Sequence, residues 1–245
     1  MCSHYQAIKE RERLYREFGV YPPDEDGKYD VWPGYVAGAI RRPAEWDVGD
    51  EAVPPRESFA GRFGLIPHWA TDAKAVRNTF NARSETVVTK PSFREAWKRG
   101  QRCIIPVDAF FETDWRSGKA VATRIASADG QPLGIGGLWS WWKPASGGII
   151  HSFAMLTINA QGHELMEHFH KPTDEKRMVV ILPPERYQDW LEVPVERSMK
   201  FMLAYPAELL QSESAPPPTG VLVLGLSPTQ NRPSLPIFSD PPRYR

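Results

Sequence analysis

The sequence predicts an α+β fold in which mainly antiparallel strands close, or nearly close, into a barrel-like sheet with helices around it. Two observations carry this expectation. Between residues 102 and 160, short runs rich in β-branched and aromatic residues alternate with turn-forming clusters such as RSG at 116–118 and PASGG at 144–148. Outside this stretch, short segments with helical spacing of apolar residues, ended by glycines, predict several small helices.

The first hundred residues are expected to hold two helices, one or two strands among the loops of residues 20–58, and a strand directly after them. A charged helix over Ala7–Phe18 ends at Gly19, and a second helix over Ser92–Arg99 has Ser92 as its N-cap and ends at Gly100. The strand candidates are Tyr35–Ile40 and Phe59–Ile66, the latter ended by Pro67.

The rest of the chain is expected to be dominated by a meander of five strands. These are Arg102–Val107, Ala109–Trp115, Lys119–Ala126, Leu133–Trp142 and Ile149–Thr157. They are followed by a helix at Gln161–Phe169, a strand at Met178–Leu182, helices at Pro184–Leu191 and Val195–Leu203, a Pro-rich link at Ala215–Gly220 and a last strand at Val221–Leu226. We expect one domain over residues 1–245, with an irregular Pro-rich segment from about residue 215.

Composition excludes several classes of protein. The two cysteines, Cys2 and Cys103, are too few for a disulfide framework and favour a reducing cytoplasm. No apolar run is long enough to cross a membrane, and the N-terminal residues lack the apolar stretch of a secretory signal. The 30 basic and 30 acidic residues cancel, whereas a protein that holds long duplex DNA through many phosphates usually has a basic excess. Any binding of nucleic acid must therefore come from a local site.

A histidine-rich stretch at 163–170 suggests a zinc site, but its spacing argues against one. A zinc-protease helix needs histidines four residues apart, whereas His163 and His168 are five apart. His163, Glu167 and His170 share one helical face, yet no other cluster supplies further ligands. We therefore expect no metal and no cofactor. His170 precedes Pro172 and could face a cleft at a helix end.

Cys2 is the most informative single residue. If Met1 is removed, as is expected before a small residue, Cys2 carries a free α-amine beside its thiol. This aminothiol can condense with an aldehyde to an imine and then close to a five-membered thiazolidine. A terminal amine has a pKa of roughly 7.7–8.0, so a useful fraction is neutral and nucleophilic near pH 7. The alternative is that position 2 merely tolerates a small residue and that Cys2 has no chemical role.

Two further segments contain candidate site residues. Asn81 and Arg83 could present an amide and a guanidinium to a pocket, the guanidinium suiting a phosphate, or they could merely open a helix. Glu112 lies at the end of a buried strand beside two phenylalanines, where desolvation would raise its pKa and suit it to acid–base work. A surface glutamate on an edge strand is the alternative.

The chain also holds nine tryptophans. Most are expected in the core, and period-2 alternation places Trp139 and Trp141 on one face of their strand. An exposed aromatic ring near the site, such as Trp69, could stack on an unpaired base.

Five segments together resemble the SRAP family, named for SOS-response-associated peptidase. They are MC at the N-terminus, GRFGLIPHWA at 61–70, FNARSET at 80–86, RCIIPVDAFFE at 102–112 and FHKPTDEKRMVVIL at 169–182. The resemblance implies a protein that recognises abasic sites in single-stranded DNA and crosslinks to the ring-opened sugar through a thiazolidine. It also implies an SRAP-like barrel and a peptidase activity, with removal of its own Met1 suggested.

The resemblance assigns roles to particular residues. Cys2 is the nucleophile, Asn81 and Arg83 position the sugar and its phosphate, Glu112 is the acid–base carboxylate and His170 assists ring opening. His4, Phe63, Trp69 and Arg177 are the further DNA-binding candidates.

Three departures from the family pattern stand out. His4 occupies a position where the family commonly has arginine, and Phe63 stands where a tryptophan is usual. Six residues separate His170 from Arg177, more than the usual spacing, which leaves His168 as an alternative to His170.

The chemistry leaves two other functions open. Cys2, His170 and Glu112 could cleave a peptide or amide repeatedly, or the chain could bind single-stranded DNA without any attack. We further expect a monomer that is cytoplasmic, and nucleoid-associated in a bacterium.

Overall fold

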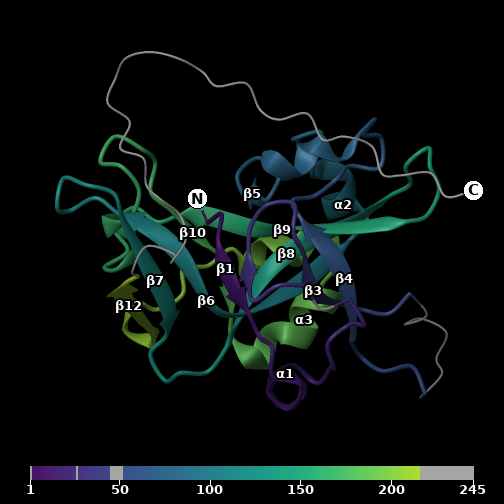
Figure 1. Cartoon of the computed structure of the whole chain (residues 1–245), viewed down its shortest axis with the longest axis horizontal. Helices are drawn as coiled ribbons and strands as arrows, with labels where there is room; N and C mark the ends of the chain where they lie inside the picture. Colours follow the sequence, from purple (N-terminus) through teal and green to yellow (C-terminus); the bar gives the residue numbers. More distant parts are fainter. Residues whose placement is uncertain (1, 26, 45–51, 216–245) are drawn as a thin grey trace, which may run out of the picture. The chain divides into compact units, whose positions relative to one another are not determined.

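Five strands close into a barrel in the computed structural model, which describes residues 2–25, 27–44 and 52–215. The ring runs β3–β4–β9–β8–β6 and returns to β3, where Ile40 pairs with Ile104. All neighbours are antiparallel except β4 and β9. The predicted α+β class with a closed barrel is therefore confirmed (Figure 1). The barrel strands are β3 (Val36–Arg41), β4 (Glu57–Phe63), β6 (Arg102–Asp114), β8 (Leu133–Trp142) and β9 (Ile150–Asn159).

In the described part of the chain, seven further strands extend the sheet from the ring. Strand β6 pairs with β1 and β7, which in turn pair with β2 and β12. Strand β9 pairs with β5 and β10, and β8 pairs with β11. Their bounds are β1 (Tyr5–Ala7), β2 (Asp30–Val31), β5 (Asn81–Arg83), β7 (Val121–Ser127), β10 (Arg177–Val179), β11 (Ile181–Leu182) and β12 (Leu210–Ser214).

The helices are short and lie outside the ring (Figure 1). α1 buries Leu14 and Phe18 and ends at Gly19, whose φ of 73° is the left-handed conformation that glycine adopts without strain. The α-helices are α1 (Arg11–Phe18), α2 (Arg94–Lys98) and α3 (Tyr187–Glu192), and the 3₁₀ turns are η1 (Ala73–Arg77), η2 (Met166–His168), η3 (Pro184–Arg186), η4 (Val195–Phe201) and η5 (Ala207–Leu209).

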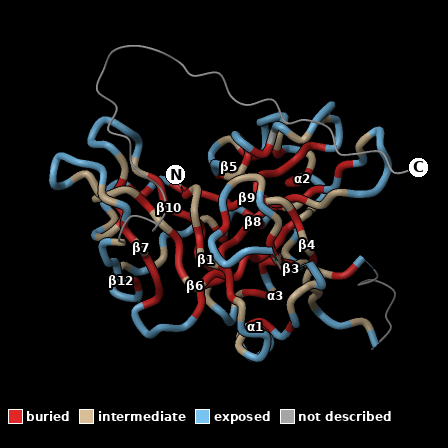
Figure 2. Tube along the Cα trace, in the orientation of Figure 1, coloured by how far each residue is buried: buried red, intermediate tan, exposed pale blue. Residues whose placement is uncertain are grey.

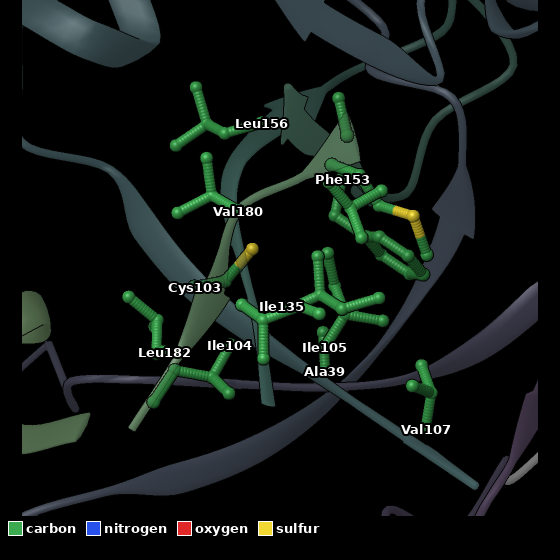
Figure 3. Close-up of a cluster of buried hydrophobic side chains, with 14 of the residues drawn as sticks. Ala39, Cys103, Ile104, Ile105, Val107, Ile135, Phe153, Leu156, Val180 and Leu182 are labelled. Carbon is green, nitrogen blue, oxygen red and sulfur yellow. The ribbon is translucent and has the colours of Figure 1, made fainter. Parts of the chain in front are cut away.

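The core fills the barrel interior. Side chains of β6, β8 and β9 such as Ile105, Ile135 and Phe153 are fully buried and pack together (Figure 3), and the tube view shows burial running along these strands while the connecting loops stay exposed (Figure 2). Gly134 in β8 permits a close approach of α3, because a Cβ there would lie 2.5 Å from the Tyr187 ring.

The structure corrects several expected boundaries in the first half of the chain. The first helix begins at Arg11 rather than Ala7, because Tyr5–Ala7 pair with β6 as a strand. The second begins at Arg94, and neither Ser92 nor another side chain caps it. The runs predicted at 102–107 and 109–115 form the single strand β6.

The expected helix at Gln161–Phe169 is wrong. Only Met166–His168 form a 3₁₀ turn, and the preceding loop is organised by the His163 ring. His163 Nδ1 accepts the backbone N–H of Leu165 and Met166, and its Nε2 donates to the Tyr205 carbonyl at 2.7 Å. The short strands β5 and β12 were not expected, and the predicted strand Val221–Leu226 lies outside the described residues.

Candidate active site at Cys2

Cys2 reaches the end of β6 because the segment after it pairs with that strand. Tyr5 lies opposite Phe110 in an antiparallel register, and Phe111 donates its N–H to the His4 carbonyl at 3.0 Å. Continuing that register along the chain brings Cys2 beside Glu112 and the residue after it. Local strand pairing therefore delivers the N-terminal thiol to the candidate carboxylate.

The Cys2 side chain is buried, and this determines its protonation. Burial, and then the nearby Glu112 carboxylate, raise the pKa of the Cys2 thiol to about 12. Its Sγ donates to the His4 carbonyl at 3.4 Å. With Met1 attached, Cys2 is therefore a thiol at neutral pH rather than a thiolate.

Asn81 fixes the backbone of Cys2. Strand β5 runs parallel to β9, with Asn81 opposite Met155, and the Asn81 side-chain Nδ2 donates to the Cys2 carbonyl at 2.7 Å. Asn81 is 8% exposed, and its Oδ1 has no hydrogen-bond partner within the described residues. A buried acceptor of this kind is costly unless something donates to it, so the Asn81 oxygen is available to a donor that arrives at Cys2.

Glu112 and His170 form a buried acid–base pair. His170 Nε2 lies 3.1 Å from Glu112 Oε2, and both side chains are almost fully buried. His168, the alternative considered from the sequence, lies in η2 and acts electrostatically on Asp114 instead. The geometry thus places His170 at Glu112.

The backbone around His170 is held in an unusual conformation. His170 has a φ of 66°, in the left-handed region that a non-glycine residue seldom adopts. Its N–H donates to the Thr113 carbonyl at 2.9 Å, and Lys176 Nζ donates to the carbonyls of Phe169, His170 and Lys171. Backbone strain of this kind persists where surrounding contacts enforce it, often at functional sites.

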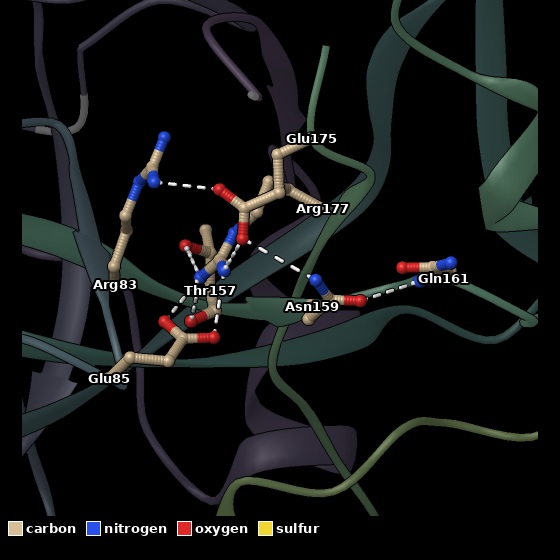
Figure 4. A network of polar contacts seen from close by, with 7 residues as sticks. All are labelled: Arg83, Glu85, Thr157, Asn159, Gln161, Glu175 and Arg177. Atoms are coloured by element: carbon tan, nitrogen blue, oxygen red, sulfur yellow. Dashed lines mark hydrogen bonds and ion pairs between the residues drawn. The ribbon is translucent and has the colours of Figure 1, made fainter. Parts of the chain in front are cut away.

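Arg83 and Arg177 belong to one polar network beside the site (Figure 4). Arg177 bonds to Glu85, Glu175 and the Thr157 carbonyl, and it is only 1% exposed. Glu175 also binds Arg83 Nη1 at 2.7 Å, and the hydrogen bond from Arg177 holds the pKa of Glu175 below its usual value. Arg83 remains exposed. The Arg177 guanidinium is buried: its two terminal nitrogens are bonded inside the protein, and its Nε is buried without a hydrogen-bond partner among the described residues, so it is not presented at the surface to DNA.

His4 lies in an aromatic stack next to Cys2. Its ring is sandwiched between Trp32, at 4.2 Å, and Phe111, at 4.0 Å, and its Nε2 lies 2.8 Å from Asp30 Oδ1. Burial lowers the pKa of His4 despite Asp30. The stack was not foreseen, because Trp32 is far from both His4 and Phe111 in the sequence and no local pattern links them.

Phe63 and Trp69, the other expected DNA contacts, lie apart from this cluster. Phe63 is fully buried with its ring edge-on to Tyr5 at 5.2 Å, so it supports the strand after Cys2 and is not available to a ligand. Trp69 is 55% exposed but shares a small hollow with Arg99 and Trp141. The structure therefore brings together Cys2, Asn81, Glu112 and His170, keeps Arg83 and His4 nearby, and separates Trp69 from them.

No described residues form a metal centre. Across residues 2–25, 27–44 and 52–215, no group of three or more histidine, cysteine or acidic side chains is placed to bind a metal ion. The structure contains no helix long and apolar enough to cross a membrane among the residues it describes.

Fold and site together define an α+β barrel protein whose second residue, a cysteine, docks against a buried carboxylate–imidazole pair. The chain belongs to the SOS response associated peptidase (SRAP) family, which it matches over residues 1–215. A solved structure from Bordetella bronchiseptica is 45% identical, with a TM-score of 0.79, and the match covers 88% of this chain and 100% of that one. A second, from Bacteroides thetaiotaomicron, is 20% identical with a TM-score of 0.69 over 87% of this chain and 91% of that one, and shares the fold.

Named relatives are more distant. The abasic site processing protein YoqW of Bacillus subtilis is 37% identical over 53% of this chain and 55% of its own length. The abasic site processing protein HMCES of Gallus gallus is 27% identical over 60% of this chain and 49% of its own length. The chain thus spans about half the length of the curated relatives it matches.

Proposed function

We propose that this protein captures abasic sites in single-stranded DNA by forming a thiazolidine crosslink through Cys2 once Met1 has been removed. The observation that carries the proposal is the placement of Cys2 against the buried Glu112–His170 pair, with Asn81 holding its carbonyl. The names of the relatives, abasic site processing proteins, support the class of substrate.

The reaction balances without an oxidant or reductant. The sugar ring of an abasic site opens to expose an aldehyde at C1′, and the α-amine of Cys2 adds to that carbon. Loss of one water gives an imine, which takes up a proton to become an iminium. Sγ then adds to the iminium carbon, and the thiol gives its proton to Glu112, which restores the proton taken up in the step before. The products are one thiazolidine and one water.

Each step needs a proton moved in a confined space, and the buried pair suits that need. His170 donates to the sugar ring oxygen as the ring opens, and Glu112 takes up a proton as the amine attacks and returns one as water leaves. The thiol is protonated while the site is empty. A positively charged iminium beside Sγ lowers the pKa of the thiol, and Glu112 lies near enough to receive the proton.

Contacts with the DNA strand come from the rim of the site. Arg83 is exposed, and its partner Glu175 is exposed too, so exchanging that ion pair for a phosphate costs little. We assign Arg177 and Phe63 a supporting role, because Arg177 holds Glu175 in place and Phe63 packs behind Tyr5. The neutral overall charge is compatible with a short site whose affinity comes from a covalent bond.

The test is a denaturing gel of the protein, with Met1 removal checked by mass spectrometry, after incubation with single-stranded DNA that carries one abasic site. A shifted band that survives heat and detergent, and that is absent with intact DNA and with Cys2→Ala, is expected. Absence of that band from protein confirmed to lack Met1 would refute the proposal.

Cys2, His170 and Glu112 would also suit a cysteine hydrolase, and the family is named for a peptidase. Turnover separates the two functions: a hydrolase releases many product molecules per protein, whereas capture of an abasic site ends at one. A noncatalytic single-strand binding module is separated by Cys2→Ala, which would then leave all function intact.

A further inference from the structure

A second candidate site lies at the opposite end of the barrel from Cys2. A cavity of about 420 Å³ opens where β6 and β9 begin and β3 and β8 end. Arg102, at the start of β6, is ten residues from Glu112 on the same strand, an extended length of about 33 Å. The cavity is lined by residues that include Arg41, Arg99, Arg102, Trp139, Trp141 and His151.

Four arginines line the cavity, Arg42 being the fourth. Among the described residues that line it, none carries a carboxylate side chain. Within the described part of the chain, Arg41 pairs with Glu57 at 2.7 Å, whereas Arg99 and Arg102 form no ion pair with any carboxylate. Several like charges thus meet at one concave surface.

Arg102 makes this accumulation costly. It is buried, its Nη2 donates to Ser198 Oγ, and its guanidinium lies 5.4 Å from the centre of the Trp190 ring. Burial, and then repulsion by Arg42, lower the pKa of Arg102 to about 10. The Glu196 carboxylate opposes this shift but forms no ion pair with Arg102 among the described residues. Burying a cation is costly, and an anion placed beside Arg102 would lower that cost.

Flat aromatic rings line the same cavity. Trp139 packs under Arg41 at 4.4 Å and lies edge-on to His151, so its ring position is fixed. Trp141 projects on the same face of β8 and is 40% exposed, and Trp69 lies across the adjoining hollow that Arg99 and Trp141 also line. Exposed rings beside arginines are the surroundings in which bases stack and phosphates bind.

We propose that this cavity binds a phosphorylated nucleoside, with the phosphate at Arg99 and Arg102 and the base against Trp141. Its volume is within the range of small-ligand pockets. The ligand is either a free mononucleotide or one nucleotide of a DNA strand, which share this chemistry. The site uses none of the residues assigned to the crosslinking reaction, so it stands independently of that function.

Calorimetric titration of the full-length protein tests the proposal with three probes: dAMP, deoxyadenosine and inorganic phosphate. dAMP is expected to bind, and each half-ligand to bind at least about tenfold more weakly, because each lacks either the charged contacts or the stacked ring. Arg99→Ala and Trp141→Ala should each weaken dAMP binding about tenfold. Both side chains are on the surface or reach it, so these variants are expected to fold.

Arg94→Ala is the matched control. Arg94 is an exposed arginine of α2 that does not line the cavity and pairs with Glu95 at 3.6 Å, so its loss should leave dAMP binding unchanged. No binding of dAMP at about 1 mM, or equal binding by wild type, Arg99→Ala and Trp141→Ala, would overturn the proposal.

A second titration, with intact single-stranded DNA, distinguishes the two sources of the ligand. If Arg99→Ala weakens DNA binding as well as dAMP binding, the cavity holds part of a strand. If it weakens dAMP binding alone, the ligand is a free nucleotide. A denaturing gel of the same preparations measures crosslinking through Cys2 independently. Failure of crosslinking can therefore be distinguished from failure of nucleotide binding at this cavity.

Discussion

The two ends of the barrel handle charge in opposite ways. At the Cys2 end, Glu112 and His170 are buried and lie 3.1 Å apart, so each compensates the other. At the other end, Arg41, Arg99 and Arg102 meet at one cavity. Among the described residues, Arg41 pairs with Glu57, whereas Arg99 and Arg102 form no ion pair. A buried pair of an acid and a base is arranged to pass protons, whereas an excess of one sign is arranged to hold an ion of the other sign.

The two ends are also expected to bind in different ways. Changes at the Cys2 end should alter the formation of a covalent bond, whereas changes at the arginine end should alter only equilibrium affinity.

Removing the thiol should have the largest effect. Cys2→Ala should abolish the heat-stable adduct with abasic single-stranded DNA, because ring closure needs Sγ. Cys2→Ser keeps the α-amine, so a transient imine should still be trapped by borohydride although no stable adduct forms. The control is Cys103→Ala. Cys103 is buried in the core, so the adduct yield of this variant should equal that of the wild type. A stable adduct on Cys2→Ser would contradict ring closure.

Removing the carboxylate should be the next largest effect. Glu112→Gln keeps the shape but loses the proton acceptor, so crosslinking should slow by about 10²- to 10⁴-fold, the usual contribution of acid–base catalysis. The rate is read from single-turnover time courses on denaturing gels. Glu213→Gln, which changes an exposed glutamate of β12, is the control and should keep the wild-type rate. Equal rates for both variants would remove Glu112 from the reaction.

Loss of the amide that holds Cys2 should have a moderate effect. Asn81→Ala removes the 2.7 Å bond to the Cys2 carbonyl and leaves that carbonyl unsatisfied, at a cost of about 1–3 kcal/mol. If this free energy is lost from the activation step, because Cys2 is no longer held in position, crosslinking should slow about 10- to 100-fold. Thermal unfolding of the same variant shows how much of the cost falls on stability instead. Asn159→Ala is the control for crosslinking. It removes an amide that donates to Glu175 at 3.4 Å and accepts the Gln161 N–H at 2.8 Å but makes no bond to Cys2, so the crosslinking rate should equal wild type.

The smallest effect is expected from two half-buried histidines, His4 at the Cys2 end and His151 at the arginine end. Burial lowers the pKa of both His4 and His151 below the value that they have in the unfolded chain. The unfolded state therefore binds more protons between the folded and unfolded pKa values, and the free energy of unfolding falls as pH drops below about 6.5. Chemical denaturation at pH 7.5 and pH 5.5 measures the loss. His4→Gln should reduce it, and a loss unchanged in both His4→Gln and His151→Gln would contradict this assignment.

Local sequence patterns predicted much of the fold and the chemistry of one end. Strands bounded by clear turn clusters, such as Leu133–Trp142, were found where expected, and α1 ends at Gly19 as predicted. Cys2, Glu112 and His170 could be nominated because a resemblance to the family joined motifs far apart in the chain. Predictions were wrong where the sequence pattern was short or ambiguous, as for the helix expected at Gln161–Phe169. Hydrogen bonds to the His163 ring, rather than helical periodicity, determine the turns of that segment.

The strand content, a cysteine at position 2 and the set of candidate side chains could all be read from the sequence, because these depend on residues close together in the chain. Tertiary structure alone decided which of those side chains meet. Pairing of β1 with β6 brought Cys2 to Glu112, burial withdrew Phe63 and Arg177 from the surface, and closure of the ring gathered Arg41, Arg99 and Arg102 around one cavity. The physical reason is that strand register and burial are collective properties of the closed sheet, and no local window of the sequence contains them.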